Sequence, residues 1–401
     1  MQLVEQHIIK NNSPFYKELA EALYRSKNLY NSTLYAVRQH YFEHKQYLQY
    51  NKVRKDFQDS HQPDYEALPR KVSQMTMRMV DQNFRSFFAA IKSTKVTKAR
   101  LPKYLKKDGQ YLLVYTSQAV SARELKKNKV IVPSGLHVAI PTKVTVEQLN
   151  QVRVVPRLDY VVVEVVYTVE EPPIKEDNNR YASIDLGIDN LATIASNVHG
   201  LRPILVKGKR LKSINHCYNK RLAKAKSLLA KRNKGQKSSK RIRKLTLKRN
   251  NKVKDYLHNA SKAIVNHLVS NDIHTLVVGK NDGWKQDTAL GRVTNQNFVQ
   301  IPFNVLISML SYKCKLHGIT LLLQEESYTS KCSFLDGEDI CKHEAYVGRR
   351  VHRGLFKTQD GQLVNADING ALNILKKCKP KAFADGVQGV VVHPRVISPQ
   401  S

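Results

Sequence analysis

The stretch RYASIDLGIDNLATIAS, residues 180–196, limits the possible folds of this chain more than any other part of the sequence. Apolar residues fill both of its halves, and the Gly and Asn of the intervening GIDN suit a tight turn, so we predict two buried strands joined as a hairpin. Asp185 lies inside the first strand. A buried carboxylate costs several kcal/mol unless a cation, hydrogen-bond donors or a metal faces it. Asp185 therefore either caps the turn or meets a partner group from another part of the chain.

The elements after this hairpin follow a familiar order. A third β-prone segment at 203–206 precedes a long helical pair, and strands at 274–279 and 319–325 then alternate with helices at 302–318 and 367–378. Three strands followed by alternating helices and strands are typical of the RNase H-like fold. In that fold, acidic residues from the first strand, a later strand and the last helix meet at one end of the sheet. We therefore predict an α/β protein with several domains and an RNase H-like core.

Two carboxylates fit the acidic positions of such a core. Asp185 lies in the first strand and Asp367 opens the last helix. Mg²⁺ prefers oxygen ligands, and two such ions about 3.5–4 Å apart assist in-line attack on a phosphodiester. An N-cap role is the alternative for Asp367. Taken together with the order of elements, the two residues favour a site for two Mg²⁺ ions over two separate caps.

The N-terminal part of the chain contains a helical module and then a β-rich module. Residues from about 13 to 95 carry apolar residues at spacings of three and four, whereas 99–169 holds short β-prone runs broken by Gly and Pro. We expect one apolar stripe of the second long helix to be buried, and the polar Gln74, Arg78 and Arg85 to lie nearer its other face. The expected buried residues are Val72, Met75, Met79, Val80, Phe84 and Phe88.

The charge of the chain indicates a polyanionic partner. Lys and Arg number 67 against 33 Asp and Glu, a formal net charge of +34, which is far more than solubility requires. The densest region, residues 207–254, contains no acidic residue and has the apolar spacing of an antiparallel helical hairpin. A merely solvated hairpin would mix the two signs. The expected phosphate-binding residues are Lys207, Lys209, Arg210, Lys231, Arg232, Lys240, Arg241, Arg243, Lys248 and Arg249.

Several features set the expected compartment. The five cysteines form no CxxC pair, the first residues lack the apolar run of a signal peptide, and no segment approaches the length of a membrane span. We expect a cytoplasmic protein with reduced thiols and without a membrane partner.

Four motifs carry a resemblance to a known family. YASIDLGIDNLATIAS, NQNFVQIPF, ESYTSK and NADINGALNIL resemble TnpB, the OrfB protein of bacterial insertion sequences and a relative of the compact type V CRISPR effectors. The resemblance implies an RNA-guided endonuclease that binds a guide RNA from the transposon end and cleaves double-stranded target DNA beside a short motif, with no small-molecule substrate. Asp185 matches the first catalytic aspartate of the RuvC-like site, and Asp367 matches the last.

The resemblance also implies the domain organisation of the chain. The N-terminal half is expected to hold the first strand of the β (wedge) module at 1–12, a helical recognition module at 13–97 and the β-barrel-like wedge module at 98–179. The first part of the RuvC-like nuclease follows at 180–327 and includes the basic hairpin at 207–269. A degenerate zinc-finger-like insertion that binds target nucleic acid is expected at 328–362, and the last nuclease part with the C-terminal tail at 363–401. Recognition of the target-adjacent motif is expected partly from Gln74 and Arg78, since Gln pairs with adenine and Arg with guanine.

The chain departs from the family at the middle acid. The strand after the helical pair usually ends in a catalytic Glu, but Gly279 stands there. We predict that Glu326, or failing that Glu325, completes the metal site from the end of the next strand. That strand lies about 4.8 Å further from Asp185 in the usual arrangement. Both residues being solvated acids is the alternative.

A second departure concerns zinc. The insertion usually holds two CxxC pairs, whereas this chain offers Cys332, Cys341, His343 and His352 without that spacing. We therefore expect no zinc. Two other functions remain open: an RNA-guided repressor with an inactive nuclease, because the middle acid is displaced, and, less favoured, a DDE-type transposase, which also uses an RNase H core.

Overall fold

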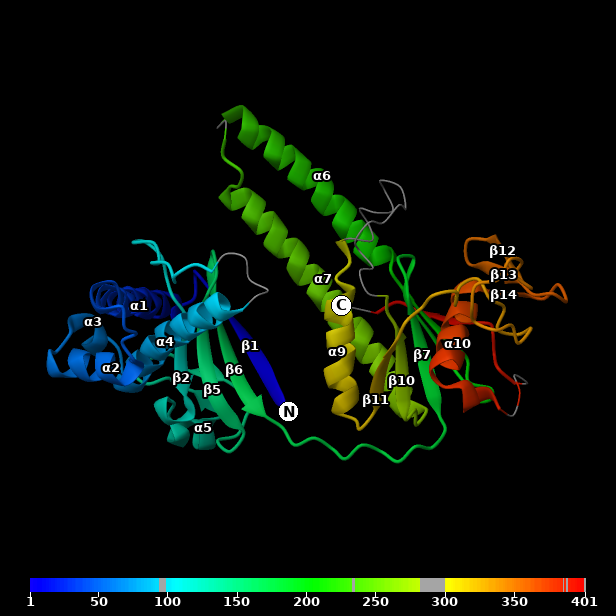
Figure 1. Cartoon of the computed structure of the whole chain (residues 1–401), viewed down its shortest axis with the longest axis horizontal. Coiled ribbons are helices and arrows are strands. Elements are labelled where there is room, and N and C mark those ends of the chain that lie inside the picture. The colour runs from blue at the N-terminus through cyan, green and yellow to red at the C-terminus, as the bar shows by residue number, and fades with distance from the viewer. Residues whose placement is uncertain (94–98, 233–234, 282–299, 385, 387–388, 400–401) are drawn as a thin grey trace. The chain divides into compact units, whose positions relative to one another are not determined.

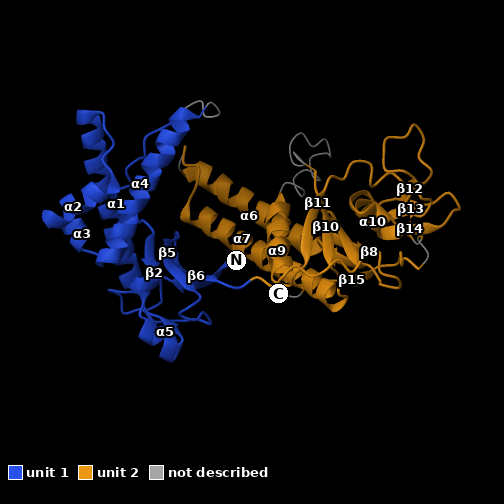
Figure 2. Ribbon diagram, turned by 60° about the horizontal axis from the view of Figure 1, so that its bottom comes forward, with its two compact units in different colours: residues 1–170 blue, residues 171–401 orange. Residues whose placement is uncertain are grey.

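The structure is a computed structural model that describes residues 1–93, 99–232, 235–281, 300–384, 386 and 389–399. Residues 295–299 of the NQNFVQIPF motif and 94–97 of the expected helical module lie outside the described part. The chain divides into two compact units, residues 1–170 and 171–401 (Figure 2). Among the described residues, no helix combines the length and the apolar character that crossing a membrane requires.

The first unit contains a four-stranded antiparallel sheet. Its order is β1 (Gln2–Lys10), β6 (Tyr160–Thr168), β5 (Leu149–Pro156) and β2 (Leu113–Thr116). The first strand of the chain thus pairs along its whole length with β6, from Gln2 opposite Thr168 to Lys10 opposite Tyr160. A short helix, α5 (Ala122–Asn128), and a two-stranded sheet of β3 (Val130–Ile131) and β4 (Ile140–Pro141) complete the β-rich part.

In the described residues before β2, the chain forms four helices. They are α1 (Tyr16–His44), α2 (Tyr50–Asp59), α3 (Pro63–Glu66) and α4 (Arg70–Lys92). The helices α1 and α4 pack on each other and share one core with the sheet.

The buried face of α4 differs from the expected one. Val72, Val80 and Phe84 are buried as predicted, but Met77 is buried in place of Met75 and Met79. The small residues Ser73 and Thr76 also belong to this face, because their hydroxyl groups have hydrogen-bond partners. Ser73 Oγ donates to the Tyr65 carbonyl at 2.8 Å, and Thr76 Oγ1 lies 3.3 Å from Ser26 Oγ. Counting apolar residues along a helix therefore does not identify a buried face that includes hydroxyl groups with hydrogen-bond partners.

The second unit is built on a six-stranded sheet in the order β11, β10, β7, β8, β9, β15. The antiparallel strands β7 (Tyr181–Leu186), β8 (Asn190–Ser196) and β9 (Ile204–Lys207) come first, and β10 (Thr275–Gly279) and β11 (Thr320–Gln324) then add in parallel on the β7 side. This confirms the predicted hairpin and the RNase H-like order. The short edge strand β15 (Arg395–Ile397), which pairs with β9, was not foreseen.

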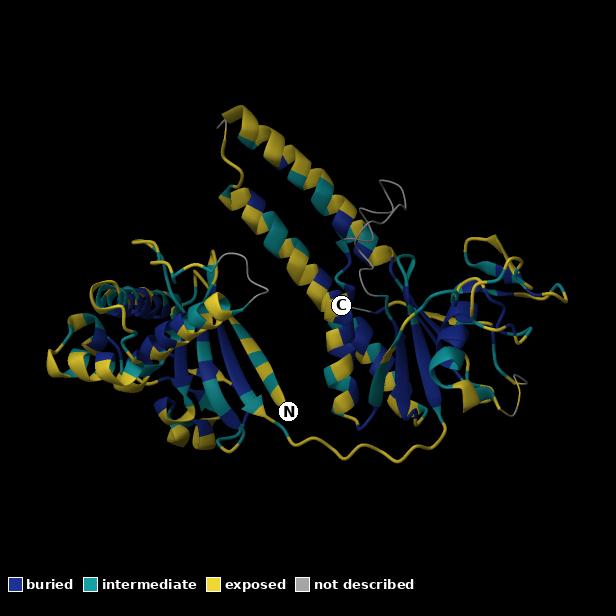
Figure 3. Cartoon of the chain, viewed as in Figure 1, coloured by how far each residue is buried: buried dark blue, intermediate teal, exposed yellow. Residues whose placement is uncertain are grey.

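Helices cover both faces of this sheet (Figure 1). On one face lie α7 (Lys240–Ser270) and α9 (Phe303–Lys315), and on the other lies α10 (Ala366–Cys378). Together, α6 (Lys209–Arg232) and α7 form the predicted basic hairpin, whose tip carries mostly exposed residues (Figure 3).

The insertion between β11 and α10 contains a small antiparallel sheet. Its strands are β12 (Arg349–His352), β13 (Leu355–Lys357) and β14 (Leu363–Asn365). The last of these strands continues directly into α10. After α10 the chain forms a short 3-10 turn, η2 (Pro380–Phe383).

Candidate functional site

The alternation of strand β7 directs Asp185 toward α10. Ala182, Ile184 and Leu186 belong to the core on the α7 and α9 face, so the odd-numbered residues face the other way. Ser183 accordingly donates from Oγ to the Ala371 carbonyl of α10 at 2.5 Å. A Cβ at Gly370 would lie 3.1 Å from Asp185 Oδ2, so the glycine allows α10 to approach the carboxylate closely.

The carboxylate of Asp185 lies among other acids. The residue is half-buried by area, yet burial is the main reason why the pKa of Asp185 is raised well above its ordinary value. The charges of Glu326 and Asp367 raise this pKa further, and Arg350 opposes them. The predicted three acids from β7, the end of β11 and α10 therefore come together in the structure.

Asp367 is not the N-cap of α10. That position belongs to Asn365, whose Oδ1 accepts hydrogen bonds from the backbone N–H groups of Asp367 at 3.0 Å and Ile368 at 3.2 Å. The Asp367 carboxylate is instead held by Asn190 of the β7–β8 hairpin, which donates to Oδ2 at 2.8 Å, and by Arg350 at 3.4 Å from Oδ1. Asp367 therefore does not cap the helix, and its carboxylate is directed toward the sheet instead.

Gly279 provides the space for Glu326. In the parallel register Gly279 pairs with Gln324, the last residue of β11, and Val278 pairs with Ile184 next to Asp185. A Cβ at Gly279 would overlap Oε1 of Glu326 and lie only 2.7 Å from Cδ1 of Ile374. The Glu326 carboxylate therefore crosses over β10 and fills the space that a side chain at 279 would occupy.

Backbone contacts fix Glu326 in this position. Its N–H donates to Asn281 Oδ1 at 2.9 Å, and its carbonyl accepts from Thr329 Oγ1 at 2.8 Å. Burial, followed by the charge of Glu325, raises the pKa of Glu326 to about 7. Within the described residues, the buried Oε1 atom has no hydrogen-bond partner. An orphaned carboxylate oxygen beside two other acids fits the ligand set of a hard divalent cation.

Glu325 points elsewhere. Its carboxylate forms an ion pair with Lys377 at 2.6 Å and accepts from the Ser327 N–H at 2.7 Å. The contact with Lys377 has the largest effect, and together these contacts lower the pKa of Glu325 to about 2. The strand ends at Gln324, so consecutive residues are no longer held to opposite faces, and the structure places Glu326 rather than Glu325 beside Asp185.

Two buried asparagines of α10 were missed by the sequence analysis. Asn369 donates to the Cys332 carbonyl at 2.8 Å, and Asn373 donates to the carbonyls of Thr329 at 2.9 Å and Cys332 at 2.7 Å. They fasten the segment that follows Glu326 to the helix that carries Asp367. Asn residues four apart on an otherwise apolar helix were the available signal.

Most predicted phosphate-binding residues of the hairpin are exposed, and Lys207 is half-buried. Arg249 differs from them. Its Nε donates to Asn215 Oδ1 at 2.8 Å and one terminal nitrogen donates to the Gln300 carbonyl at 2.7 Å. Burial lowers the pKa of the Arg249 guanidinium. We correct its assignment from phosphate binding to joining α6, α7 and the segment that precedes α9.

The predicted base-reading face of α4 borders a pocket of about 250 Å³, lined by Gln49, Tyr50, Asn51, Arg78, Asp81, Gln82 and Arg85. The guanidinium of Arg78 lies 5.0 Å from the centre of the Tyr50 ring, and Arg85 pairs with Asp81 at 2.8 Å. Half-buried Gln74 does not line this pocket, whereas the exposed Gln82, one turn beyond Arg78, does.

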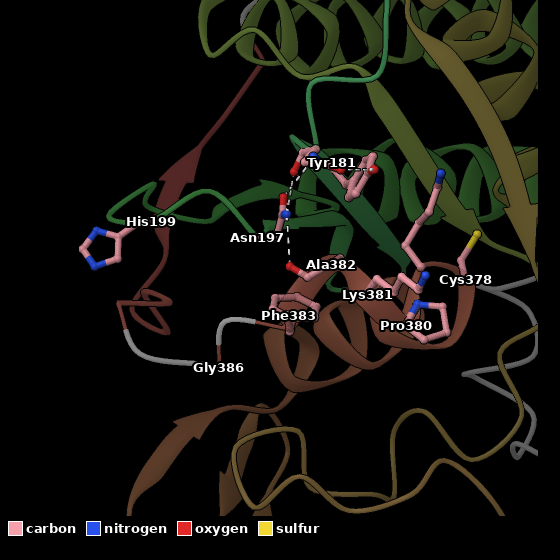
Figure 4. A pocket seen from close by; sticks show the side chains of 11 residues that line it. Tyr181, Asn197, His199, Cys378, Pro380, Lys381, Ala382, Phe383 and Gly386 are labelled. Carbon is pink, nitrogen blue, oxygen red and sulfur yellow. Dashed lines mark hydrogen bonds between the residues drawn. The ribbon is translucent and has the colours of Figure 1, made fainter.

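A further pocket of about 950 Å³ lies beside Tyr181, the first residue of β7 (Figure 4). The side chain of Asn197 spans it: Oδ1 accepts from the Tyr181 N–H at 2.8 Å, and Nδ2 donates to the Asn179 carbonyl at 2.8 Å and to the Ala382 carbonyl at 3.2 Å. The hydrogen-bonding capacity of Asn197 is thus used within the fold, and we assign this pocket no ligand.

The sheet order and the three acids define an α/β protein with a RuvC-type RNase H-like core. Two family models match the chain: "OrfB_IS605: Probable transposase" over residues 164–285 and "Cas12f1-like, TNB domain" over residues 303–374. In these two regions, each of which covers less than half of its length, the chain is similar to TnpB-type proteins.

Two individual proteins are similar to the chain as well. The TnpB-like protein ORF457 of Acidianus two-tailed virus is 26% identical over 209 residues, which cover 51% of this chain and 43% of the viral protein. The aligned region thus spans less than half of that relative. The structure of a Cas12f1–sgRNA–target DNA complex matches with a TM-score of 0.52 at 16% identity, over 90% of this chain and 83% of that protein, which shows a common fold.

Proposed function

We propose that the chain is an RNA-guided, Mg²⁺-dependent endonuclease that cleaves double-stranded DNA beside a short motif through a single RuvC-like site. The observation that carries the proposal is the convergence of Asp185, Glu326 and Asp367, with a buried Glu326 oxygen that has no partner in the described part of the chain. Clustered carboxylates repel one another unless cations bind between them.

The three acids would hold the metal ions, and bound divalent ions would activate a water and stabilise the leaving oxygen of a phosphodiester. The chain's own residues position these ligands. Asn190 orients the Asp367 carboxylate, while Asn281 and Thr329 fix the backbone of Glu326. Preorganised ligands lose little entropy when the metals and the substrate bind.

Nucleic acid would be bound by the exposed Lys and Arg residues of the α6–α7 hairpin. Their side chains neutralise phosphates irrespective of sequence, and a guide RNA from the transposon end would supply the sequence specificity. The pocket beside α4 is our candidate for reading the target-adjacent motif, with Arg78 and Gln82 as the base-reading residues.

Guide-dependent cleavage of a DNA target in Mg²⁺ tests the function. We expect single Ala substitutions of Asp185, Glu326 or Asp367 to abolish cleavage while guided binding survives. Glu325→Ala is the matched control, since its carboxylate is paired with Lys377, and it should cut at close to the wild-type rate. A wild-type protein that binds guided targets without cutting them would replace this proposal with a repressor.

A further inference from the structure

The first unit carries exposed aromatic rings beside a cationic side chain on α1. Tyr35 is 59% exposed, Phe42 is 44% exposed and Tyr104 is 45% exposed. The guanidinium carbon of Arg38 lies 5.5 Å from the centre of the Phe42 ring and 5.0 Å from the centre of the Tyr104 ring. Tyr35, Arg38 and Phe42 are three and four residues apart, so they share one face of the helix. We call these four residues the aromatic surface.

The backbone around Tyr104 is fastened to α1. Asn31 binds Leu105 twice: its Nδ2 donates to the Leu105 carbonyl at 3.0 Å, and its Oδ1 accepts from the Leu105 N–H at 2.9 Å. The buried Lys27 donates from Nζ to the Lys107 carbonyl at 2.8 Å. The Tyr104 ring therefore projects from a backbone that α1 already holds, and a ligand that binds the ring does not have to order this segment.

The charge around the rings is positive. Residues 100–107, RLPKYLKK, contain four basic residues and no acidic one. Arg38 donates to the Pro102 carbonyl at 3.4 Å, and no carboxylate in the described part of the chain forms an ion pair with it. Cations beside exposed rings complement an anion that carries flat aromatic groups. A nucleic-acid duplex hides the faces of its bases within the stack, whereas an unpaired strand exposes them.

A shallow pocket of about 460 Å³ adjoins this surface. Tyr35 and Phe57 supply its rings, and Asn31 and Ser32 are among its polar residues. Both of these polar side chains are engaged within the fold, Asn31 with the backbone as described and Ser32 as a donor to Asp64. The pocket thus offers ring faces rather than groups that read base edges, and ring faces bind every base in a similar way.

We propose that the aromatic surface binds unpaired nucleotides by base stacking, which goes beyond the nuclease function and does not depend on cleavage. Phe42 and Tyr104 stack on bases, and Arg38 between them binds a phosphate or a base face. Tyr35 and Phe42 are about 10 Å apart along the helix axis, which is the length of about three stacked nucleotides. Two sources offer such a stretch: a DNA strand displaced by a guide, and an unpaired part of the guide RNA itself.

The first measurement is the affinity of the full chain for oligothymidylate and oligouridylate, after copurified nucleic acid is removed and without Mg²⁺. Phe42→Leu and Tyr104→Leu should each weaken binding about 5- to 100-fold, the usual effect of losing one stacked base. Tyr104→Phe keeps the ring and should bind as the wild type does. A larger loss with the deoxy oligonucleotide assigns the surface to the displaced strand, and a larger loss with the ribo oligonucleotide assigns it to the guide.

The salt dependence separates stacking from phosphate binding. The two Leu variants should keep the wild-type slope of log affinity against log salt, because a ring carries no charge. Lys248→Ala, on the basic hairpin, is the matched comparison and should flatten that slope by about one unit. Binding of a duplex should be unchanged in the Leu variants, and so should the melting temperature, since both rings are exposed.

The second measurement is independent of affinity. An oligonucleotide that carries 5-iodouracil is irradiated with the wild-type chain, and the crosslinked residues are identified by mass spectrometry. Crosslinks at Phe42 or Tyr104 would support the proposal. Unchanged affinity in both Leu variants, together with crosslinks confined to other parts of the chain, would overturn it. A wild-type dimer that becomes monomeric in the Leu variants, with nucleic-acid binding intact, would overturn it too, because the surface would then bind a second copy of the chain.

Discussion

The substitution Gly279→Ala tests whether the space at the end of β10 belongs to Glu326. A methyl group there would overlap Glu326 Oε1 and approach Ile374 Cδ1 to 2.7 Å. Overpacking of this kind costs about 1–3 kcal/mol. Replacing a strand glycine returns about 0.5–1 kcal/mol of backbone entropy, so we expect the free energy of unfolding to fall by no more than about 2.5 kcal/mol.

The effect on cleavage should be much larger than the effect on stability. The carboxylate must move by about 1 Å to avoid the methyl group, and a misplacement of that size at a catalytic centre costs about 100-fold in rate. The double change Gly279→Glu/Glu326→Gly puts the acid back at the end of β10 and removes the side chain that occupies its place. We expect this variant to cut faster than either single variant.

The assay is single-turnover cleavage of a guided DNA target in Mg²⁺. Thermal melting and target binding are measured in parallel to show that each variant is folded and bound. Gly279→Ser adds one further atom in the same place and should be at least as impaired as Gly279→Ala. If Gly279→Ala is folded, binds its target and cuts at the wild-type rate, then the Glu326 carboxylate does not use this space during catalysis, and the reasoning fails.

Two further predictions concern the hairpin and the acid cluster. Lys248→Ala should weaken RNA binding and flatten its salt dependence by about one unit in the log–log slope without changing the melting temperature. Arg249→Ala should instead lower the free energy of unfolding by about 1–3 kcal/mol, because the buried Asn215 and the half-buried Gln300 lose the donor to their acceptor oxygens. Equal melting temperatures for the two variants would contradict the assignment. The pKa of Glu326 is raised to about 7 in the folded protein. Between about pH 4.5 and 7 the folded state therefore retains a proton that the unfolded chain has lost. The metal-free protein should accordingly lose about 3 kcal/mol of stability as the pH rises through this range. Melting curves should show that Mg²⁺ stabilises more at pH 7.5 than at pH 5.5, and that Glu326→Gln reduces the difference; a pH-independent Mg²⁺ effect would be evidence against a metal at this residue.

The sequence specified the core of the second unit well because its signals are local. The GIDN turn and its flanking apolar runs predicted the β7–β8 hairpin, and the alternation of strands and helices predicted the order of the sheet. It specified α4 less well, because Ser73 and Thr76 are buried with their hydroxyls bonded. It also misplaced Arg249, since a basic run does not reveal which guanidinium finds acceptors within the fold, here in Asn215 and Gln300.

The choice between Glu325 and Glu326 depends on three-dimensional geometry that the sequence pattern does not contain. Alternation along a strand allows only one of two neighbours to face the site, but which one depends on where β11 ends. The strand ends at Gln324, Lys377 pairs with Glu325, and the missing side chain of Gly279 leaves room for Glu326. Each of these facts comes from a different element.

The pairing of Gly279 with Glu326 has a consequence for how such sites are identified. The space beside Asp185 is filled by a carboxylate, although the residue that carries it belongs to a neighbouring strand end. A change at either position alone would leave the space empty or doubly occupied, so the two residues are physically coupled. A test that looks for an acid at the end of β10 would therefore class this chain as inactive. The relevant question is whether a carboxylate reaches the space between β7 and α10, whichever strand supplies it.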